Sequence, residues 1–162
     1  TGTSADEGSS GEGTTAAPVC LEFHDNRVAD TPVVHFTCGL PTLCGDGDPP
    51  FFLANGDNGW TVDDLERARC MGAALRDRTP GVIAYQESAL GHHTFTIEIL
   101  GEQVVLREDW LEDFSWSYDE TVRFLKPSEF FAECAVGTAF ALHKCLSEGF
   151  TEDCGTELMC PG

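Results

Sequence analysis

Aromatic and acidic residues alternate densely over residues 108–120, which read EDWLEDFSWSYDE. Aromatic faces ringed by carboxylates can bind sugars or cations, and a pair of carboxylates can carry out acid–base hydrolysis, as in glycosidases. The same alternation fits a strand whose aromatic face is buried and whose acids lie in the adjoining turns, and its period of two favours this alternative. The ligand-binding alternative rests on five candidate residues: Trp110, Trp116, Tyr118, Glu112 and Asp113.

A second group of polar side chains has part of the spacing of an EF-hand calcium loop. The residues that match its ligand positions are Asn55, Asp57, Asp63 and Glu66. Two departures weaken the match, because Gly59 offers no side-chain ligand and Trp60 stands where the loop needs glycine. Helix capping explains the last acids of the loop equally well, and Asp46 with Asp48 is a non-EF alternative. Ca²⁺ is therefore the one cofactor that the sequence suggests.

Short motifs of common catalytic sites are absent from the sequence. The histidines lack the H-E-x-x-H spacing of zinc hydrolases, and we expect His92 and His93 to lie in an exposed loop. Neither a G-x-S-x-G nucleophile motif nor a phosphate-binding G-x-x-x-x-G-K motif occurs. We therefore predict no catalytic residue and favour a protein that is not an enzyme.

The chain contains eight cysteines and no C-x-x-C pair: Cys20, Cys38, Cys44, Cys70, Cys134, Cys145, Cys154 and Cys160. An even number spread over the folded region indicates four disulfides formed in an oxidising compartment. Reduced thiols and a zinc site are the alternatives. We predict pairs of sequence neighbours: Cys38 with Cys44, Cys134 with Cys145, Cys154 with Cys160, and by remainder Cys20 with Cys70.

Acidic residues outnumber basic ones by 28 to 9, and the net charge is −19. Such a charge repels nucleic acid and anionic membranes and attracts cations or basic partners. The longest apolar runs have only four residues, whereas a membrane-spanning helix needs about 20. We expect no nucleic-acid partner and no transmembrane segment.

Residues 1–17 contain only Thr, Gly, Ser, Ala, Asp and Glu, a composition that cannot form a core. This segment resembles the low-complexity tethers that follow the lipidated cysteine of bacterial envelope lipoproteins. Since the chain begins at Thr1 rather than Met, we expect a removed signal peptide, and the resemblance implies a lipid anchor before residue 1.

Residues 18–162 read as a single α+β domain. A helix is expected over residues 62–78, capped by Thr61 and Asp64, with short helices over residues 127–135 and 139–148. Cys70 lies opposite the apolar stripe of the first helix, so we expect its partner in the N-terminal layer. Four to five strands form an antiparallel meander over residues 82–87, 93–100, 103–108, 114–118 and 121–125. Residues 18–60 form an irregular layer with short strands.

These observations predict an exported or surface-tethered, disulfide-bonded binding or structural domain in the cell envelope, the periplasm or the secreted fraction. Its expected partner is a protein or glycan at the cell surface. The alternative is an extracytoplasmic hydrolase, or a carbohydrate- or calcium-binding module, that uses carboxylates of residues 108–120 or 46–66.

Overall fold

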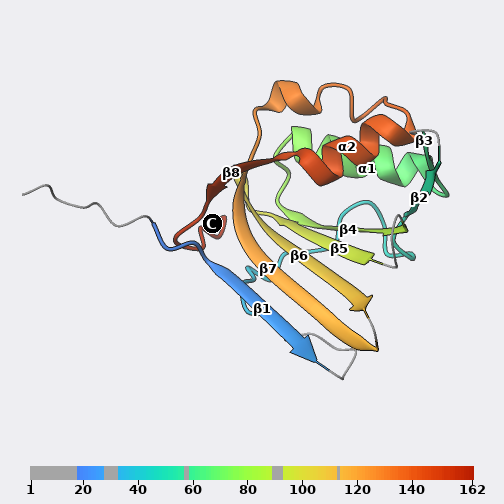
Figure 1. Ribbon diagram of the computed structural model, residues 1–162. Helices are drawn as coiled ribbons and strands as arrows, with labels where there is room; N and C mark the ends of the chain where they lie inside the picture. Colours follow the sequence, from blue (N-terminus) through green and yellow to red (C-terminus); the bar gives the residue numbers. More distant parts are fainter. Residues whose placement is uncertain (1–17, 28–32, 57–58, 89–92, 113) are drawn as a thin grey trace, which may run out of the picture.

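The computed structural model describes residues 18–27, 33–56, 59–88, 93–112 and 114–162, and the predicted tether lies outside them (Figure 1). Within these residues an eight-stranded sheet packs against two α-helices and a short 3-10 helix. The elements, in chain order, are β1 Glu22–Arg27, β2 Phe51–Asn55, β3 Gly59–Val62, α1 Leu65–Arg76, β4 Gly81–Ser88, β5 His93–Ile99, β6 Gln103–Glu112, β7 Ser115–Leu125, the 3-10 helix η1 Ser128–Phe131, α2 Ala139–Glu148 and β8 Phe150–Cys154.

The strands follow the order β1-β7-β6-β5-β4-β2-β3, and β8 pairs with β7 beyond the end of β1. All pairs are antiparallel except β2 with β4. The α+β prediction is confirmed, but the predicted number of strands is wrong. β1, β2 and β8 are short strands that pair with strands distant in sequence, and β3 joins the sheet through a local hairpin with β2.

The predicted break between strands 114–118 and 121–125, which implies a turn at Asp119 and Glu120, is also wrong, because both residues continue β7. Asp119 pairs with His24 across β1. Glu120 accepts hydrogen bonds from the backbone N–H groups of His35 and Phe36. Both carboxylates therefore have partners inside the fold. Two adjacent acidic residues usually indicate a turn, but here they lie within β7.

Helix ends follow local signals with one shift. Helix α2 begins after Thr138, whose hydroxyl accepts from the Ala141 N–H, and it ends at Gly149, as predicted. Helix α1 starts at Leu65 rather than at residue 62, because Asp64 accepts the capping bond from the Arg67 N–H. Thr61, the predicted cap, belongs to β3. The helix predicted over residues 127–135 is only the shorter η1.

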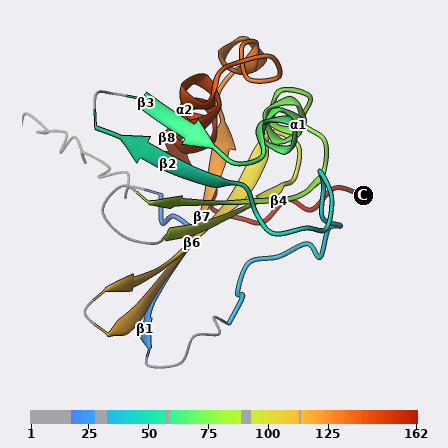
Figure 2. The same cartoon turned by 90° about the vertical axis from the view of Figure 1, so that its right-hand side faces the viewer.

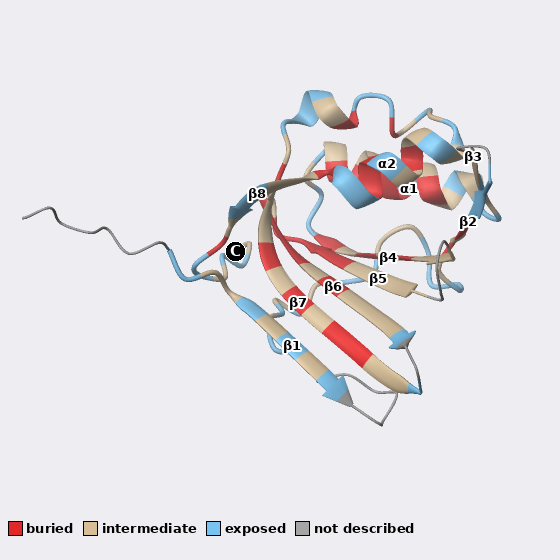
Figure 3. Ribbon diagram, viewed as in Figure 1, coloured by how far each residue is buried: buried red, intermediate tan, exposed pale blue. Residues whose placement is uncertain are grey.

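Both α-helices lie on one face of the curved sheet, here called the helix face (Figures 1 and 2). The main core forms between them and the sheet and is the largest group of buried residues (Figure 3). It includes Phe52, Met71, Leu75, Ile97 and Leu142.

The opposite face carries a smaller core of Leu100, Val105 and Val122, covered by apolar residues of the two terminal segments. Two buried carboxylates, Glu98 and Glu120, hold the irregular segment that follows residue 32 against this face. Glu98 accepts from the Cys38 N–H at 2.8 Å, and Glu120 accepts from the Phe36 N–H at 2.7 Å. The irregular N-terminal layer is thus fixed by hydrogen bonds to side chains of the sheet.

All eight cysteines form disulfides, and the predicted pairing is correct only for Cys134 with Cys145. The other three predicted pairs are wrong, and the observed bonds are Cys20–Cys154, Cys38–Cys160 and Cys44–Cys70. The error has a topological cause: β1 and β8 lie along the same edge of β7, so the two ends of the domain meet. Cys70 does find its partner in the N-terminal layer, as expected.

Phe114 occupies the turn between β6 and β7 with a φ of 69° and a side chain that is 97% exposed. A left-handed backbone costs a phenylalanine about 1 kcal/mol, whereas asparagine adopts it readily. We therefore expect Phe114→Asn to raise the free energy of unfolding by about 1 kcal/mol in urea denaturation. Leu111→Asn is the control, because Leu111 is also exposed but has no positive φ. Equal stabilisation by both variants would contradict backbone strain as the cause.

Candidate functional site

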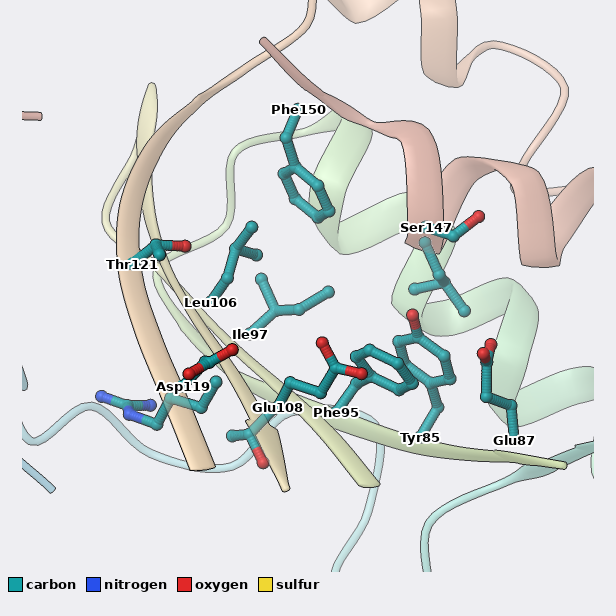
Figure 4. A pocket seen from close by; sticks show the side chains of 13 residues that line it. Tyr85, Glu87, Phe95, Ile97, Leu106, Glu108, Asp119, Thr121, Ser147 and Phe150 are labelled. Atoms are coloured by element: carbon teal, nitrogen blue, oxygen red, sulfur yellow. The ribbon is translucent and has the colours of Figure 1, made fainter. Parts of the chain in front are cut away.

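A pocket of about 280 Å³ lies between the helix face of the sheet and the chain that passes over it from α2 to β8 (Figure 4). Its walls are mainly apolar. Tyr85, Phe95, Ile97 and Leu106 come from the sheet, and Leu146 and Phe150 come from α2 and the start of β8. The pocket is a continuation of the main core, because most of these residues also belong to that core or pack against it.

Strand register determines which side chains meet in the pocket. One row of paired residues crosses five strands in the order Tyr85, Phe95, Glu108, Asp119 and His24. Directly paired side chains in a sheet project from the same face and lie about 5 Å apart. The row is therefore aromatic at the β4 end and charged at the β7 end, and Glu87, two residues after Tyr85 on β4, adds a third carboxylate to the same face.

Tyr85 is the most deeply buried polar residue of the pocket, with 1% of its surface exposed. Its ring stacks on Phe95 at a centroid distance of 4.8 Å and meets the edge of Phe52 at 5.8 Å. Figure 4 shows its hydroxyl pointing into the space below α2. Among the residues that the structure describes, this hydroxyl has no hydrogen-bond partner.

Burial raises the pKa of the Tyr85 hydroxyl well above its usual range, and the charges of Glu87 and Glu108 raise this pKa further. The hydroxyl is therefore neutral at any physiological pH and can both donate and accept a hydrogen bond. The hydroxyl faces the pocket, where a polar group of a bound molecule can replace solvent as its hydrogen-bond partner.

Three carboxylates line the pocket, and each is paired with a histidine from another element. His143 of α2 places Nε2 at 2.6 Å from Glu87. His93 of β5 places Nδ1 at 2.8 Å from Glu108. His24 of β1 bonds to Asp119.

The imidazoles of two of these pairs also stack on tryptophans. His143 lies on Trp60 at a centroid distance of 3.6 Å, and His93 lies beside Trp110 at 5.9 Å. Because His93 is part of β5 and half-buried, the sequence prediction of an exposed loop is wrong for this residue. The histidines instead fix the positions of the carboxylates at the pocket.

A shallow hollow adjoins the pocket over β1. It is lined by Glu22, Phe23 and His24, and it shares Asp119 and Thr121 with the pocket. The two depressions therefore adjoin at Asp119 and Thr121, with the apolar pocket under α2 and an acidic hollow over β1. A ligand longer than the pocket can extend in this direction.

The aromatic residues predicted as a ligand site do not share one surface. Trp110 lies on the helix face, in register with His93 and Ser117. Trp116 and Tyr118 point to the opposite face, where the hydroxyl of the buried Tyr118 donates to Glu120. Two of the five predicted positions, Asp113 and the side chain of Glu112, lie outside the described part of the structure.

The residues predicted to bind calcium lie around the β2–β3 hairpin. Asn55 pairs with Gly59 at the end of the hairpin, Asp63 accepts from the Phe51 N–H, and Glu66 is exposed in the first turn of α1. Asp57 lies outside the described residues. The described residues contain no group of three or more His, Cys, Asp or Glu arranged to hold a metal. Calcium binding stays a prediction, which thermal melting with millimolar Ca²⁺ would test.

Sequence patterns did not reveal the pocket residues. Tyr85 and Phe95 are ordinary core positions of alternating strands, and Glu108 and Asp119 meet only because β6 and β7 pair in this register. Strand alternation gives each side chain a face, but no local motif gives the register of the neighbouring strand.

Comparisons with protein-family models, with curated proteins and with solved structures found no match for this chain. Within the described residues, no helix has the length and apolar character required to cross a membrane. The pocket and the residues around it are therefore the basis on which a function can be proposed.

Proposed function

We propose that this protein is an extracytoplasmic binding domain that holds a small molecule in the pocket beneath α2. The unpartnered hydroxyl of Tyr85 at the bottom of an apolar pocket is the observation that carries this proposal. Ligand sites are typically concave, mostly apolar and furnished with a few polar groups that orient the ligand. The four disulfides support a place outside the cytoplasm.

The pocket volume sets the size of the bound group. An apolar cavity of about 150 Å³ accepts benzene, and this pocket has about 280 Å³. It therefore suits one aromatic ring with a short side chain, and larger ligands would extend over β1. A probe of this size is 2-phenylethanol, whose ring fits the apolar walls and whose hydroxyl can bond to Tyr85.

We expect 2-phenylethanol to bind saturably, with a dissociation constant of the order of 1 mM in calorimetric titration. Tyr85→Phe is expected to weaken binding about fivefold through loss of one hydrogen bond. The same variant should not lower stability, because the Tyr85 hydroxyl has no partner within the described fold. A purely structural role of Tyr85 would give the reverse pattern, with stability reduced and binding unchanged.

Blocking the mouth of the pocket gives a second test of the same site. Ser147 is exposed on α2 and lines the pocket, so Ser147→Trp should abolish binding without disturbing the core. Ser128→Trp is the matched control, since Ser128 is exposed on η1 and does not line the pocket. Undiminished binding by the Ser147 variant would refute the pocket as the site.

Acid–base hydrolysis is the second candidate function, and it rests on Glu108 and Asp119. These carboxylates are direct neighbours across β6 and β7, and both line the pocket. Hydrolysis of 4-nitrophenyl glycosides that is lost in Asp119→Asn would favour this candidate over binding alone.

A further inference from the structure

The charge of the pocket specifies its ligand more narrowly than its shape does. Glu87, Glu108 and Asp119 reach it from three different strands, and Glu22 lies in the adjoining hollow. One basic residue, Arg107, contributes to the lining. Its guanidinium points away and donates to the Phe36 carbonyl and to Glu98 on the opposite face. The described lining therefore holds several carboxylates and no Lys or Arg head group.

The histidine partners leave the carboxylates able to bind a cation. A neutral imidazole donates one N–H to a carboxylate, and an ionised carboxylate can accept about four hydrogen bonds. With its imidazole neutral, each of the three pairs carries a negative charge and can still accept a further donor. His24, His93 and His143 orient the carboxylates and leave acceptor sites for a ligand.

Aromatic rings extend from the bottom of the pocket toward these carboxylates. Phe95 stacks between Tyr85, at 4.8 Å, and His93, at 6.0 Å, and Trp110 continues the series beyond His93. Aromatic faces attract ammonium groups, and this attraction grows when the cation is partly desolvated. Rings beside carboxylates are the surroundings that suit an organic ammonium ion.

We infer that the ligand of this pocket is a primary amine that carries a ring-sized apolar group, with its ammonium bound among Glu87, Glu108 and the Tyr85 hydroxyl. The inference rests on the proposed binding function and specifies the ligand class for the same site. The field of Glu87 and Glu108 already acts on Tyr85, since both charges raise its pKa. The net charge of −19 also favours the approach of cations over that of anions.

Three probes of nearly equal size separate charge from shape: phenethylamine, 2-phenylethanol and phenylacetate. In calorimetric titrations at pH 7, we expect the amine to bind at least about tenfold more tightly than the alcohol. Phenylacetate should show no binding even at about ten times the concentration used for the alcohol. Equal binding of amine and alcohol, or tighter binding of phenylacetate, would overturn the cation inference and leave the pocket function intact. If none of the three saturates, the binding function itself fails.

Neutral variants assign the preference to particular carboxylates. Glu108→Gln and Glu87→Gln should each reduce the amine-to-alcohol affinity ratio about fivefold, while affinity for the alcohol changes little. Glu66→Gln removes the same charge from an exposed position on α1 that does not line the pocket, and it should leave the ratio unchanged. An equal drop in all three variants would assign the preference to net charge and contradict a site at the pocket.

Discussion

Replacing Arg107 with Met is expected to lower the free energy of unfolding by about 3–5 kcal/mol, the typical cost of leaving a buried charge without its partner. Arg107 Nη2 lies 2.5 Å from Glu98, and both side chains are buried, with 8% and 1% of their surface exposed. The same guanidinium donates to the Phe36 carbonyl. The variant therefore loses an ion pair and one attachment of the N-terminal layer together. Urea denaturation followed by tryptophan fluorescence measures the loss.

The pH dependence of this loss distinguishes an electrostatic cause from a packing cause. Burial alone would raise the pKa of Glu98, but hydrogen bonds from Arg107 and from the Cys38 and Leu40 N–H groups hold the pKa below its usual range. The stability that this carboxylate contributes is thus present above its ordinary pKa and is lost as the pH falls through the lowered value. Without Arg107 the pKa of Glu98 rises. The variant therefore loses the unpaired buried charge of Glu98, and the instability that this charge causes, at a higher pH than that at which the wild type protonates the same group.

We therefore expect the stability difference between wild type and Arg107→Met to narrow as the pH falls from 7 toward about 4. Adding Glu98→Gln to the variant should recover part of the loss at pH 7, because the amide removes the unpaired charge and keeps an acceptor for the Cys38 N–H. Arg76→Met, which breaks an exposed pair with Asp77, is the control for loss of a surface arginine. A loss that does not change with pH would contradict the electrostatic account.

Local signals in the sequence were sufficient for much of the helix-and-meander part of the domain. Thr138 and Gly149 mark α2 because a side-chain acceptor and a glycine satisfy helix ends within one turn. The alternation of residues 93–99 marks β5 because one face is buried and the neighbouring strands are close in sequence.

The buried carboxylates show where local signals fail. Glu98 and Glu120 are almost fully buried, although an acidic residue in a strand normally indicates a solvated face. Their partners are backbone N–H groups 60 and 84 residues away, at Cys38 and Phe36. No pattern within a strand indicates such a distant partner, so the sequence alone predicts a turn at Glu120. The candidate site depends on the same kind of information, since its row of side chains exists only through the register of five strands.

The two disulfides that join the ends of the domain depend on each other energetically. Cys20–Cys154 and Cys38–Cys160 span 134 and 122 residues of sequence. When one of them is intact, however, the other closes a loop of only about 24 residues, made of the two short stretches between the paired cysteines. A cross-link stabilises by restricting the unfolded chain, and this restriction grows with the logarithm of loop length.

We expect removal of either disulfide alone to cost about 3 kcal/mol, because the loop that is lost has only about 24 residues. Removal of both should cost about 8 kcal/mol, because the second removal opens the long loop. That loop still has more than about 80 residues after the segments closed by Cys44–Cys70 and Cys134–Cys145 are subtracted. The full stability of a domain is about 5–15 kcal/mol. Alanine replacement of all four cysteines should therefore leave the domain largely unfolded at 37 °C, whereas a variant that lacks only one of the two disulfides should still fold. Removing Cys134–Cys145, which spans 11 residues, serves as the comparison, and its effect should add simply to that of either long-range disulfide. Urea denaturation of the three double variants and the fourfold variant measures these values. If the fourfold variant loses no more stability than one double variant, the result would contradict the account in which these disulfides stabilise the domain by restricting the unfolded chain.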